Sequence, residues 1–92
     1  MIRSFRSKDT EYLFRQERVR KWAAIERLAL RKLVQLDLAR SLDDMRAPPG
    51  NRLEALSGNR KGQWSVRIND QYRICFRWSA EGPEDVEIVD YH

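Results

Sequence analysis

The chain has 92 residues, of which 41% are hydrophobic and 35% charged, and its formal net charge at pH 7 is +4. A chain of this length builds one small domain with a single modest core. Its apolar stretches fall short of the roughly 18–20 residues that a membrane-spanning helix needs, and its charged N-terminal segment is unlike a signal peptide, so we expect a cytoplasmic protein. The single cysteine, Cys75, cannot form an internal disulfide, which agrees with a reducing compartment.

The first half of the chain predicts one strand and two helices. Residues 2–6 alternate apolar and polar side chains over the length of a short strand. Residues 11–15 predict a short helix that has Asp9 or Thr10 as its N-cap. Apolar side chains, Leu28 included, then recur three or four residues apart from Trp22 to about Arg40, which predicts the main helix.

The second half predicts a sheet. Residues 41–45 predict a capped helical turn, and the segment 47–51, which reads APPGN, excludes both helix and central strand. Four runs of strand-like composition follow, separated by turn-forming residues: 52–56, 63–68, 72–78 and 85–91. We therefore predict an α+β fold in a single domain over residues 1–92, with an N-terminal strand, two helices that cover one face, and an antiparallel sheet of about four strands.

Basic residues concentrate in the predicted sheet. Residues 46–77 carry seven basic and two acidic side chains, whereas residues 78–92 carry five acidic and no basic ones. Strand alternation places Arg67, Arg73 and Arg77 together on the face opposite the apolar one, near the basic turn 59–62. Such a cluster is typical of a phosphate-binding surface, and the alternative is an ordinary solvated outer face.

The only histidine is His92, which follows Asp90 and Tyr91 at the end of the last predicted strand. Histidine normally titrates near neutral pH, so His92 is the candidate for acid–base chemistry. Guanidinium groups bind phosphate and stabilise the negative charge that develops when the phosphorus is attacked. Together these groups suit RNA cleavage by internal transfer from the 2′-hydroxyl. The alternative is a solvated, idle chain end.

Other chemistries lack the residues they need. The sequence contains no Gly-rich phosphate loop, no His/Cys spacing for a metal site, and no serine or cysteine nucleophile with a plausible histidine partner. We therefore expect neither a metal ion nor an organic cofactor.

Four motifs resemble those of the HigB toxins of the RelE/ParE superfamily, and the resemblance extends over the whole chain. They are RLEAL at 52–56, GQWSVRIN at 62–69, YRI at 72–74 and the closing DYH at 90–92. The resemblance implies a RelE-like fold and a toxin of a type II toxin–antitoxin system. Such toxins are mRNA interferases that enter the ribosomal A site on the small subunit and cleave translated mRNA. A helix-turn-helix antitoxin of the HigA type neutralises them, and operator DNA is bound only indirectly, through the antitoxin complex.

The resemblance also implies catalytic roles for residues of this chain. Arg73 is the expected phosphate and transition-state stabiliser, His92 the acid or base, and Asp90 and Tyr91 its neighbours. Glu54 stands where the family pattern has a histidine, and Ser57 stands where the family pattern has a lysine. Either Glu54 is the proton acceptor, which requires a neighbouring arginine that keeps it ionised, or the chain relies on fewer catalytic groups and cleaves slowly. The alternative for Glu54 itself is a structural salt bridge. By charge, the expected RNA or ribosome contacts are Arg52, Arg60, Lys61, Arg67 and Arg77.

Two other classes of function remain open from the sequence. Relatives of the ParE type inhibit DNA gyrase by binding and have no nuclease chemistry, and a third possibility is a basic nucleic-acid-binding module without toxicity. If the acid–base set is incomplete, the enzyme depends on the ribosome to orient the RNA, because positioning supplies a large part of the barrier reduction. We therefore predict little cleavage of free RNA.

Overall fold

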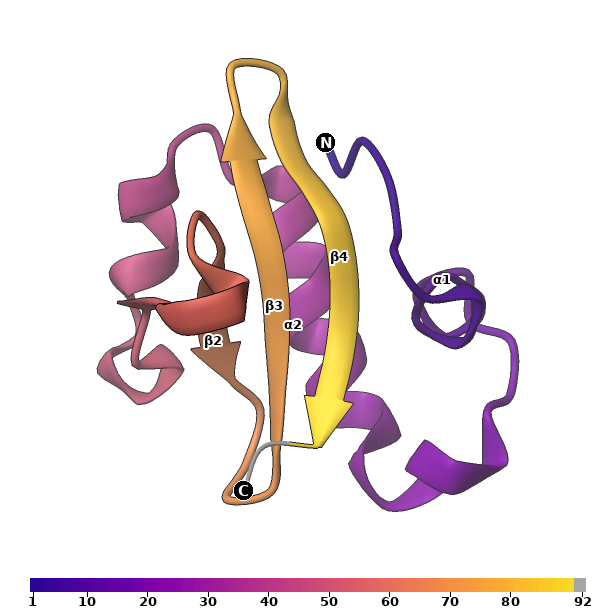
Figure 1. Cartoon of the computed structure of the whole chain (residues 1–92). Helices are drawn as coiled ribbons and strands as arrows, with labels where there is room; N and C mark the ends of the chain where they lie inside the picture. Colours follow the sequence, from indigo (N-terminus) through magenta and orange to yellow (C-terminus); the bar gives the residue numbers. More distant parts are fainter. Residues whose placement is uncertain (91–92) are drawn as a thin grey trace.

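The computed structural model describes residues 1–90 and consists of a four-stranded antiparallel sheet with the helix α2 packed across one face (Figure 1). The helices are α1 (Lys8–Phe14) and α2 (Glu26–Leu38), and the 3₁₀ turns are η1 (Arg20–Ile25), η2 (Leu42–Arg46), η3 (Pro49–Asn51) and η4 (Gly58–Arg60). The strands β1 (Glu54–Ala55), β2 (Trp64–Arg67), β3 (Tyr72–Ser79) and β4 (Gly82–Asp90) pair in chain order. The predicted α+β fold is confirmed.

The predicted N-terminal strand is present only as a short pairing beside β4. Phe5 forms a parallel bridge with Val86, the Arg6 amide donates to the Val86 carbonyl at 3.0 Å, and the Val86 amide donates to the Ser4 carbonyl at 3.1 Å. The Phe5 ring packs against Phe14 of α1, with ring centroids 5.6 Å apart. Since side chains alternate along an extended segment, the Arg6 side chain points to the opposite face of the sheet from Phe5.

The helices begin at residues other than the predicted ones. The N-cap of α1 is Ser7, whose hydroxyl accepts from the Thr10 amide at 3.2 Å, so Asp9 and Thr10 were wrong as caps. Thr10 is buried instead, and its hydroxyl accepts from the Ile88 amide of β4 at 3.0 Å. This hydrogen bond fixes α1 against the edge of the sheet.

The predicted main helix is in fact two elements, η1 and α2, because the backbone leaves helical geometry at Trp22 and again at Ile25. The buried positions of α2 then continue four residues apart from Ile25 through Ala29 to Leu33. Leu28, which belongs to the predicted apolar repeat, lies one residue away from that stripe and is exposed.

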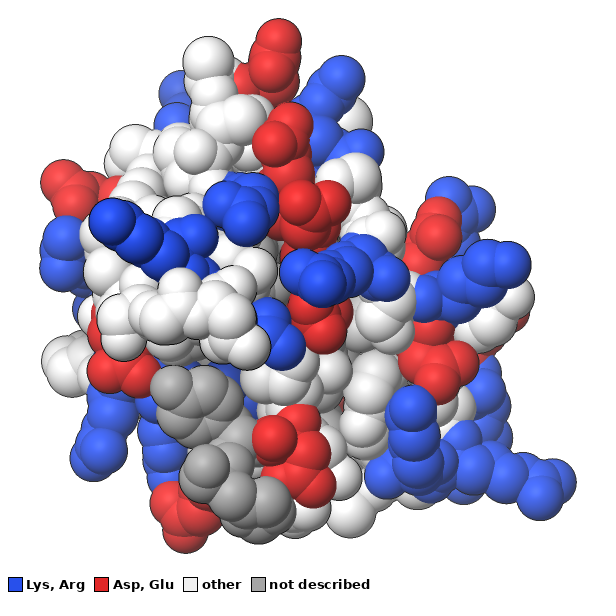
Figure 2. Space-filling view, in the orientation of Figure 1, with Lys and Arg blue, Asp and Glu red and all other residues white. Residues whose placement is uncertain are grey.

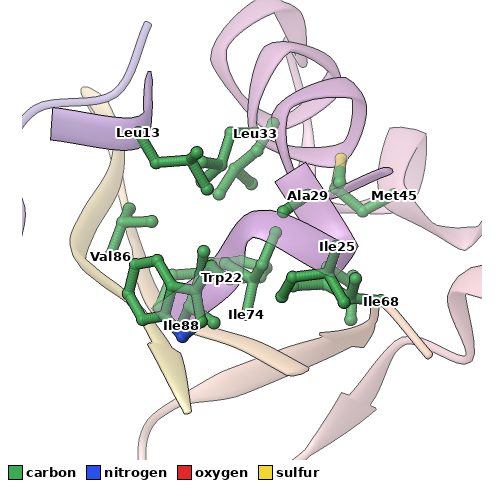
Figure 3. Close-up of a cluster of buried hydrophobic side chains, with 13 residues drawn as sticks. Leu13, Trp22, Ile25, Ala29, Leu33, Met45, Ile68, Ile74, Val86 and Ile88 are labelled. Carbon is green, nitrogen blue, oxygen red and sulfur yellow. The ribbon is translucent and has the colours of Figure 1, made fainter. Parts of the chain in front are cut away.

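The core lies between α2 and the sheet (Figure 3). Leu13 of α1 and Leu33 of α2 point toward the strand residues Ile74, Val86 and Ile88. Phe76 of β3 is fully buried in the same cluster. Burying each large apolar side chain contributes about 1.5–3 kcal/mol, so this layer supplies most of the stability of the sheet.

The loop boundaries differ from the predicted ones in two places. The proline segment was predicted to contain no helix, but it forms the short 3₁₀ turn η3. A proline is tolerated at the first position of such a turn, because the backbone N–H that it lacks would have no partner there. Gly82 and Pro83, predicted as turn residues, belong to β4 and pair with Ser79 and Trp78. The hairpin loop is shortened because the Ser79 hydroxyl accepts from the Glu81 amide at 3.1 Å.

A buried polar cluster joins α2 to the proline segment. Asn51 is fully buried, accepts a hydrogen bond from the Lys32 ammonium, and donates to the carbonyls of Met45 at 3.0 Å and Ala47 at 3.1 Å. Burial lowers the pKa of Lys32, and the charge of neighbouring Arg31 lowers it further. The cluster therefore satisfies groups that would otherwise be buried without partners.

We expect Asn51→Ala to lower the free energy of unfolding by about 3 kcal/mol, because it leaves the Lys32 ammonium and two carbonyls without their partner. Urea denaturation measures this loss. Asn59→Ala, at an exposed asparagine in η4, is the matched control and should leave stability close to that of the wild type. An equal loss in both variants would contradict the role assigned to the cluster.

Candidate active site and nucleic-acid interface

The face of the sheet turned away from α2 carries most of the predicted site. Its register aligns one row of residues across all four strands, Glu54, Ser65, Cys75 and Glu87, and a neighbouring row, Arg67, Arg73 and Val89. We call this surface the polar face. Figure 2 shows it from the front: basic side chains gather over the middle of the sheet, with acidic side chains among them.

Arg73 is held in place by contacts from two neighbouring segments. Its Nε donates to the Ser65 hydroxyl at 2.9 Å, and its NH2 donates to the Arg52 carbonyl at 2.7 Å. Its NH1 lies 3.4 Å from Oε1 of Glu54, and only 12% of its side chain is exposed. A guanidinium fixed in this way would lose little conformational freedom on binding an anion.

Glu54 lies beside an arginine, since its Oε1 is 3.4 Å from NH1 of Arg73. Half of the Glu54 side chain is exposed, so its carboxylate remains accessible from solvent while it faces the guanidinium. β1 is only two residues long and pairs Glu54 with Ser65 of β2, which is the residue that also binds Arg73. The register of β1 therefore brings Glu54 and Arg73 together. This contact is compatible both with proton transfer and with a structural salt bridge.

Cys75 lies beneath the polar face and is fully buried. Burial raises the pKa of its thiol; the Glu87 charge raises the pKa too, whereas Arg60 and Arg73 act in the opposite direction. The thiolate is therefore disfavoured, in agreement with the prediction that Cys75 is not a nucleophile. Glu87 is the β4 partner of Cys75, and Arg60 lies 3.5 Å from the Glu87 carboxylate.

The other predicted basic contacts are distributed over the same side of the molecule. Arg67 lies directly opposite Arg73 and is paired with Asp70. A bulge shifts the β4 register between Cys75 and Arg77, and Arg77 pairs with Asp85 at 3.6 Å. The extra residue of the bulge lies in β4, while Ile74, Phe76 and Trp78 of β3 continue to alternate toward the core. Arg77 therefore shares the polar face with Arg73, and its guanidinium lies next to Gly62 of the basic turn.

The basic turn contributes Arg60 and Lys61. Arg60 donates from NH1 to Oε1 of Gln63 at 3.0 Å and lies 3.5 Å from the Glu87 carboxylate, while Lys61 is exposed. Arg52 is exposed as well, and its backbone has a φ of +46° that turns its carbonyl toward Arg73. The turn therefore brings two of the predicted contacts to the edge of the polar face.

The last strand directs Asp90, one of the predicted catalytic residues, away from Arg73. Asp90 pairs with Tyr72, one position beyond the pair of Arg73 and Val89, so strand alternation directs it to the other face of the sheet from Arg73. Its carboxylate accepts from the Gln71 side chain at 3.0 Å. Tyr91 and His92 lie outside the described residues, and their assigned roles stay predictions.

Three residues of the polar face had no role in the sequence analysis: Arg6, Ser65 and Glu87. Alternation placed Ser65 on the same face as Arg67, but only the structure shows that its hydroxyl holds Arg73. Arg6 and Glu87 are 81 positions apart, and no local pattern signals their contact at 3.4 Å. Within residues 1–90 no group of three or more His, Cys, Asp or Glu side chains is placed to hold a metal ion, and none of the helices there is long and apolar enough to cross a membrane.

Comparisons with protein families and curated proteins indicate the family of the chain. A family model described as a RelE-like toxin of type II toxin-antitoxin system HigB matches residues 3–92. Toxin HigB-1 of Vibrio cholerae serotype O1 is 52% identical over 56 residues, which are 61% of this chain and 59% of that protein. An uncharacterized protein of Haemophilus influenzae is 35% identical over 48 residues, 52% of this chain and 48% of that protein. The matches thus span less than two thirds of either relative.

A solved structure shares the fold. The YoeB/ParE toxin from Agrobacterium tumefaciens superposes with a TM-score of 0.56 over 99% of this chain and 98% of that one, at 21% sequence identity. At this level of identity the likeness shows a shared arrangement of strands and helices. A shared fold does not by itself imply a shared function.

Proposed function

The chain belongs to the HigB-like family of RelE-like toxins from type II toxin–antitoxin systems, and from this membership we propose that it is a ribosome-dependent endoribonuclease that cleaves translated mRNA. The observation that carries the proposal is the guanidinium of Arg73, fixed by Ser65 and the Arg52 carbonyl with the Glu54 carboxylate beside it. A protein that acts only by binding has no need for an acid–base group next to a fixed phosphate ligand.

The reaction we propose is internal transfer. The 2′-hydroxyl oxygen attacks the adjacent phosphorus while Glu54 takes its proton, and the bond from phosphorus to the 5′-oxygen breaks as His92 donates a proton to that oxygen. The products are a 2′,3′-cyclic phosphate and a 5′-hydroxyl. Arg73 binds the phosphate and stabilises the charge that builds up on its oxygens, which is the largest single contribution expected from such a site.

The proposed partners follow from the same role. The substrate is mRNA in the ribosomal A site, contacted together with the small subunit through Arg52, Arg60, Lys61, Arg67 and Arg77. A HigA-type helix-turn-helix antitoxin neutralises the toxin, and operator DNA is reached only through that complex. We place the protein in the cytoplasm, where translation occurs. Because the ribosome positions the RNA, free RNA is cleaved slowly.

Induction of the chain in bacteria without antitoxin tests the proposal. Primer extension on a translated and an untranslated copy of one reporter RNA should reveal cuts in the translated copy only. Growth arrest with intact messages would instead indicate a gyrase inhibitor of the ParE type, and absence of arrest would leave a basic nucleic-acid-binding domain.

Deletion of His92 should abolish growth arrest, because the leaving 5′-oxygen then lacks its proton donor. Arrest is followed as colony counts after induction, with the amount of soluble protein measured in the same cultures. Full toxicity of the soluble deletion variant would remove His92 from the mechanism.

We expect Ser65→Ala to slow message cleavage about tenfold, because it removes the hydrogen bond to Arg73 Nε and leaves the other contacts of the guanidinium in place. Ser4→Ala is a suitable control, since Ser4 is exposed and its hydroxyl accepts only from the Asp85 amide among the described contacts. Cleavage is quantified as the fraction of a reporter message cut at equal protein levels. Equal rates in both variants would contradict the positioning role of Ser65.

A further inference from the structure

Three segments far apart in the sequence meet at one carboxylate of the polar face. Oε2 of Glu87 in β4 lies 3.4 Å from Nε of Arg6 and 3.5 Å from NH1 of Arg60. Arg6 is brought there by the pairing of residues 4–6 with Val86, and Arg60 is brought there by η4. We call this group the Arg6–Glu87–Arg60 triad.

The Glu87 carboxylate is mostly buried, and the two arginine side chains are more exposed than it is. Only 15% of the Glu87 side chain is exposed, against 59% for Arg6 and 33% for Arg60. A mostly buried negative charge beneath one exposed and one half-buried guanidinium group leaves a surface with net positive charge. The carboxylate also restricts the two long side chains, so they lose less conformational freedom on meeting an anion.

The contacts within the triad are ionic and leave one atom unsatisfied. Oε2 of Glu87 is buried, and within residues 1–90 it has no hydrogen-bond partner, since both distances exceed those of good N–H···O bonds. A purely structural salt bridge would be expected to satisfy that oxygen. The looser geometry is that of guanidinium groups held near a carboxylate while their N–H groups can still turn to a ligand at the surface.

The triad lies next to Arg73. Glu87 pairs with Cys75 on the neighbouring strand, and Arg73 is two residues from Cys75 on the same strand and face. The backbone positions of Arg73 and Glu87 are therefore about 7 Å apart along the strand and about 5 Å apart across it. Long arginine side chains at this separation can reach two phosphates of one nucleic-acid strand. An RNA strand whose scissile phosphate lies on Arg73 would therefore bring an adjacent phosphate to the triad.

We propose that the Arg6–Glu87–Arg60 triad binds a second phosphate of the same single-stranded RNA, next to the one held by Arg73. The identification of the ligand as RNA rests on the proposed function. Arg6 and Arg60 contact the phosphate, and Glu87 is a positioning residue that holds them. The N-terminal segment thereby becomes part of the substrate site.

Equilibrium binding of a short, labelled single-stranded RNA to the full chain, measured over a series of salt concentrations, tests the proposal. Each phosphate contact adds about 0.7 to the slope of log K against log salt for a single strand, so the double substitution of Arg6 and Arg60 by Ala should lower the slope by about 0.7. Arg6→Ala and Arg60→Ala alone should each lower the slope by part of that amount and weaken binding about fivefold at about 0.1 M salt. Arg15→Ala is the matched control, because Arg15 is 65% exposed and pairs with one carboxylate, Glu11, away from the sheet. It should change neither quantity.

Other outcomes would overturn this inference or the proposed function separately. Slopes equal to that of Arg15→Ala, or a wild-type chain that does not bind RNA at low salt, would exclude the second phosphate. A lowered melting temperature with unchanged binding would identify the triad as a structural clamp of the N-terminal segment. If slopes stay unchanged while translated messages are still cut, this inference fails and the proposed function stands. If slopes fall but no message is cut, the triad is a nucleic-acid site and the proposed nuclease activity fails.

Discussion

Message cleavage should fall by about 10²–10³-fold in Arg73→Lys, and growth arrest should disappear with it. Lysine keeps the positive charge but replaces the planar guanidinium with a single ammonium, which cannot reach Ser65, the Arg52 carbonyl and a phosphate together. The interaction that is lost is the one that strengthens as charge builds up on the phosphate. The single-turnover rate on ribosomes programmed with one message measures the loss.

A matched substitution separates this effect from general damage. Arg46→Lys changes an exposed arginine that pairs with Asp43 in η2, away from the polar face, and should cleave at the wild-type rate. Thermal melting of both variants checks that the fold is retained. A folded Arg73→Lys protein that cleaves as fast as Arg46→Lys would remove Arg73 from the reaction.

Glu54→Gln should lower the cleavage rate by about 10²–10⁴-fold, because glutamine has the size of glutamate and can accept a hydrogen bond from Arg73 but cannot take the proton of the 2′-hydroxyl. The same substitution should change the free energy of unfolding by no more than about 1 kcal/mol, since the carboxylate is half exposed and its ion pair is partly screened by solvent. Rates and urea denaturation are therefore measured on the same preparation.

The two measurements distinguish the two roles of Glu54. A large loss of rate with little loss of stability identifies a proton acceptor. A loss of stability with an unchanged rate identifies a structural salt bridge, and the proton would then need another acceptor. Glu81→Gln, at an exposed glutamate in the hairpin loop, controls for the loss of one negative charge and should leave both quantities unchanged.

Local patterns were sufficient for the outline of the fold. Alternation and turn residues predicted the order of the strands, because each hairpin joins neighbours in sequence, and they placed Arg73 on the face away from the core. The break at Trp22 and Ile25 was missed, since a 3₁₀ turn and an α-helix bury apolar residues at nearly the same spacing. The bulge in β4 was also missed, because it contains Asp85, a non-glycine residue with a positive φ.

The site was harder to predict than the fold because its contacts are non-local. Glu54 was chosen for its position in a motif, but its partner became known only from the pairing of β1 with β2. Arg6 could not be assigned at all, because its contact with Glu87 requires the N-terminal segment to lie beside the last strand. Side chains that meet across a sheet are set by register, and register depends on packing over the whole domain.

The central claim is that the polar face cleaves translated RNA by attack of the 2′-hydroxyl. The most direct test is cleavage of a ribosome-bound message whose mapped cut site carries a 2′-deoxy nucleotide, alongside the same message with the natural ribose. We predict that the deoxy message stays intact at that position while the natural one is cut and ends in a 2′,3′-cyclic phosphate. Cleavage of the deoxy message at the same position and rate would contradict the claim, because the bond would then be broken without the 2′-oxygen.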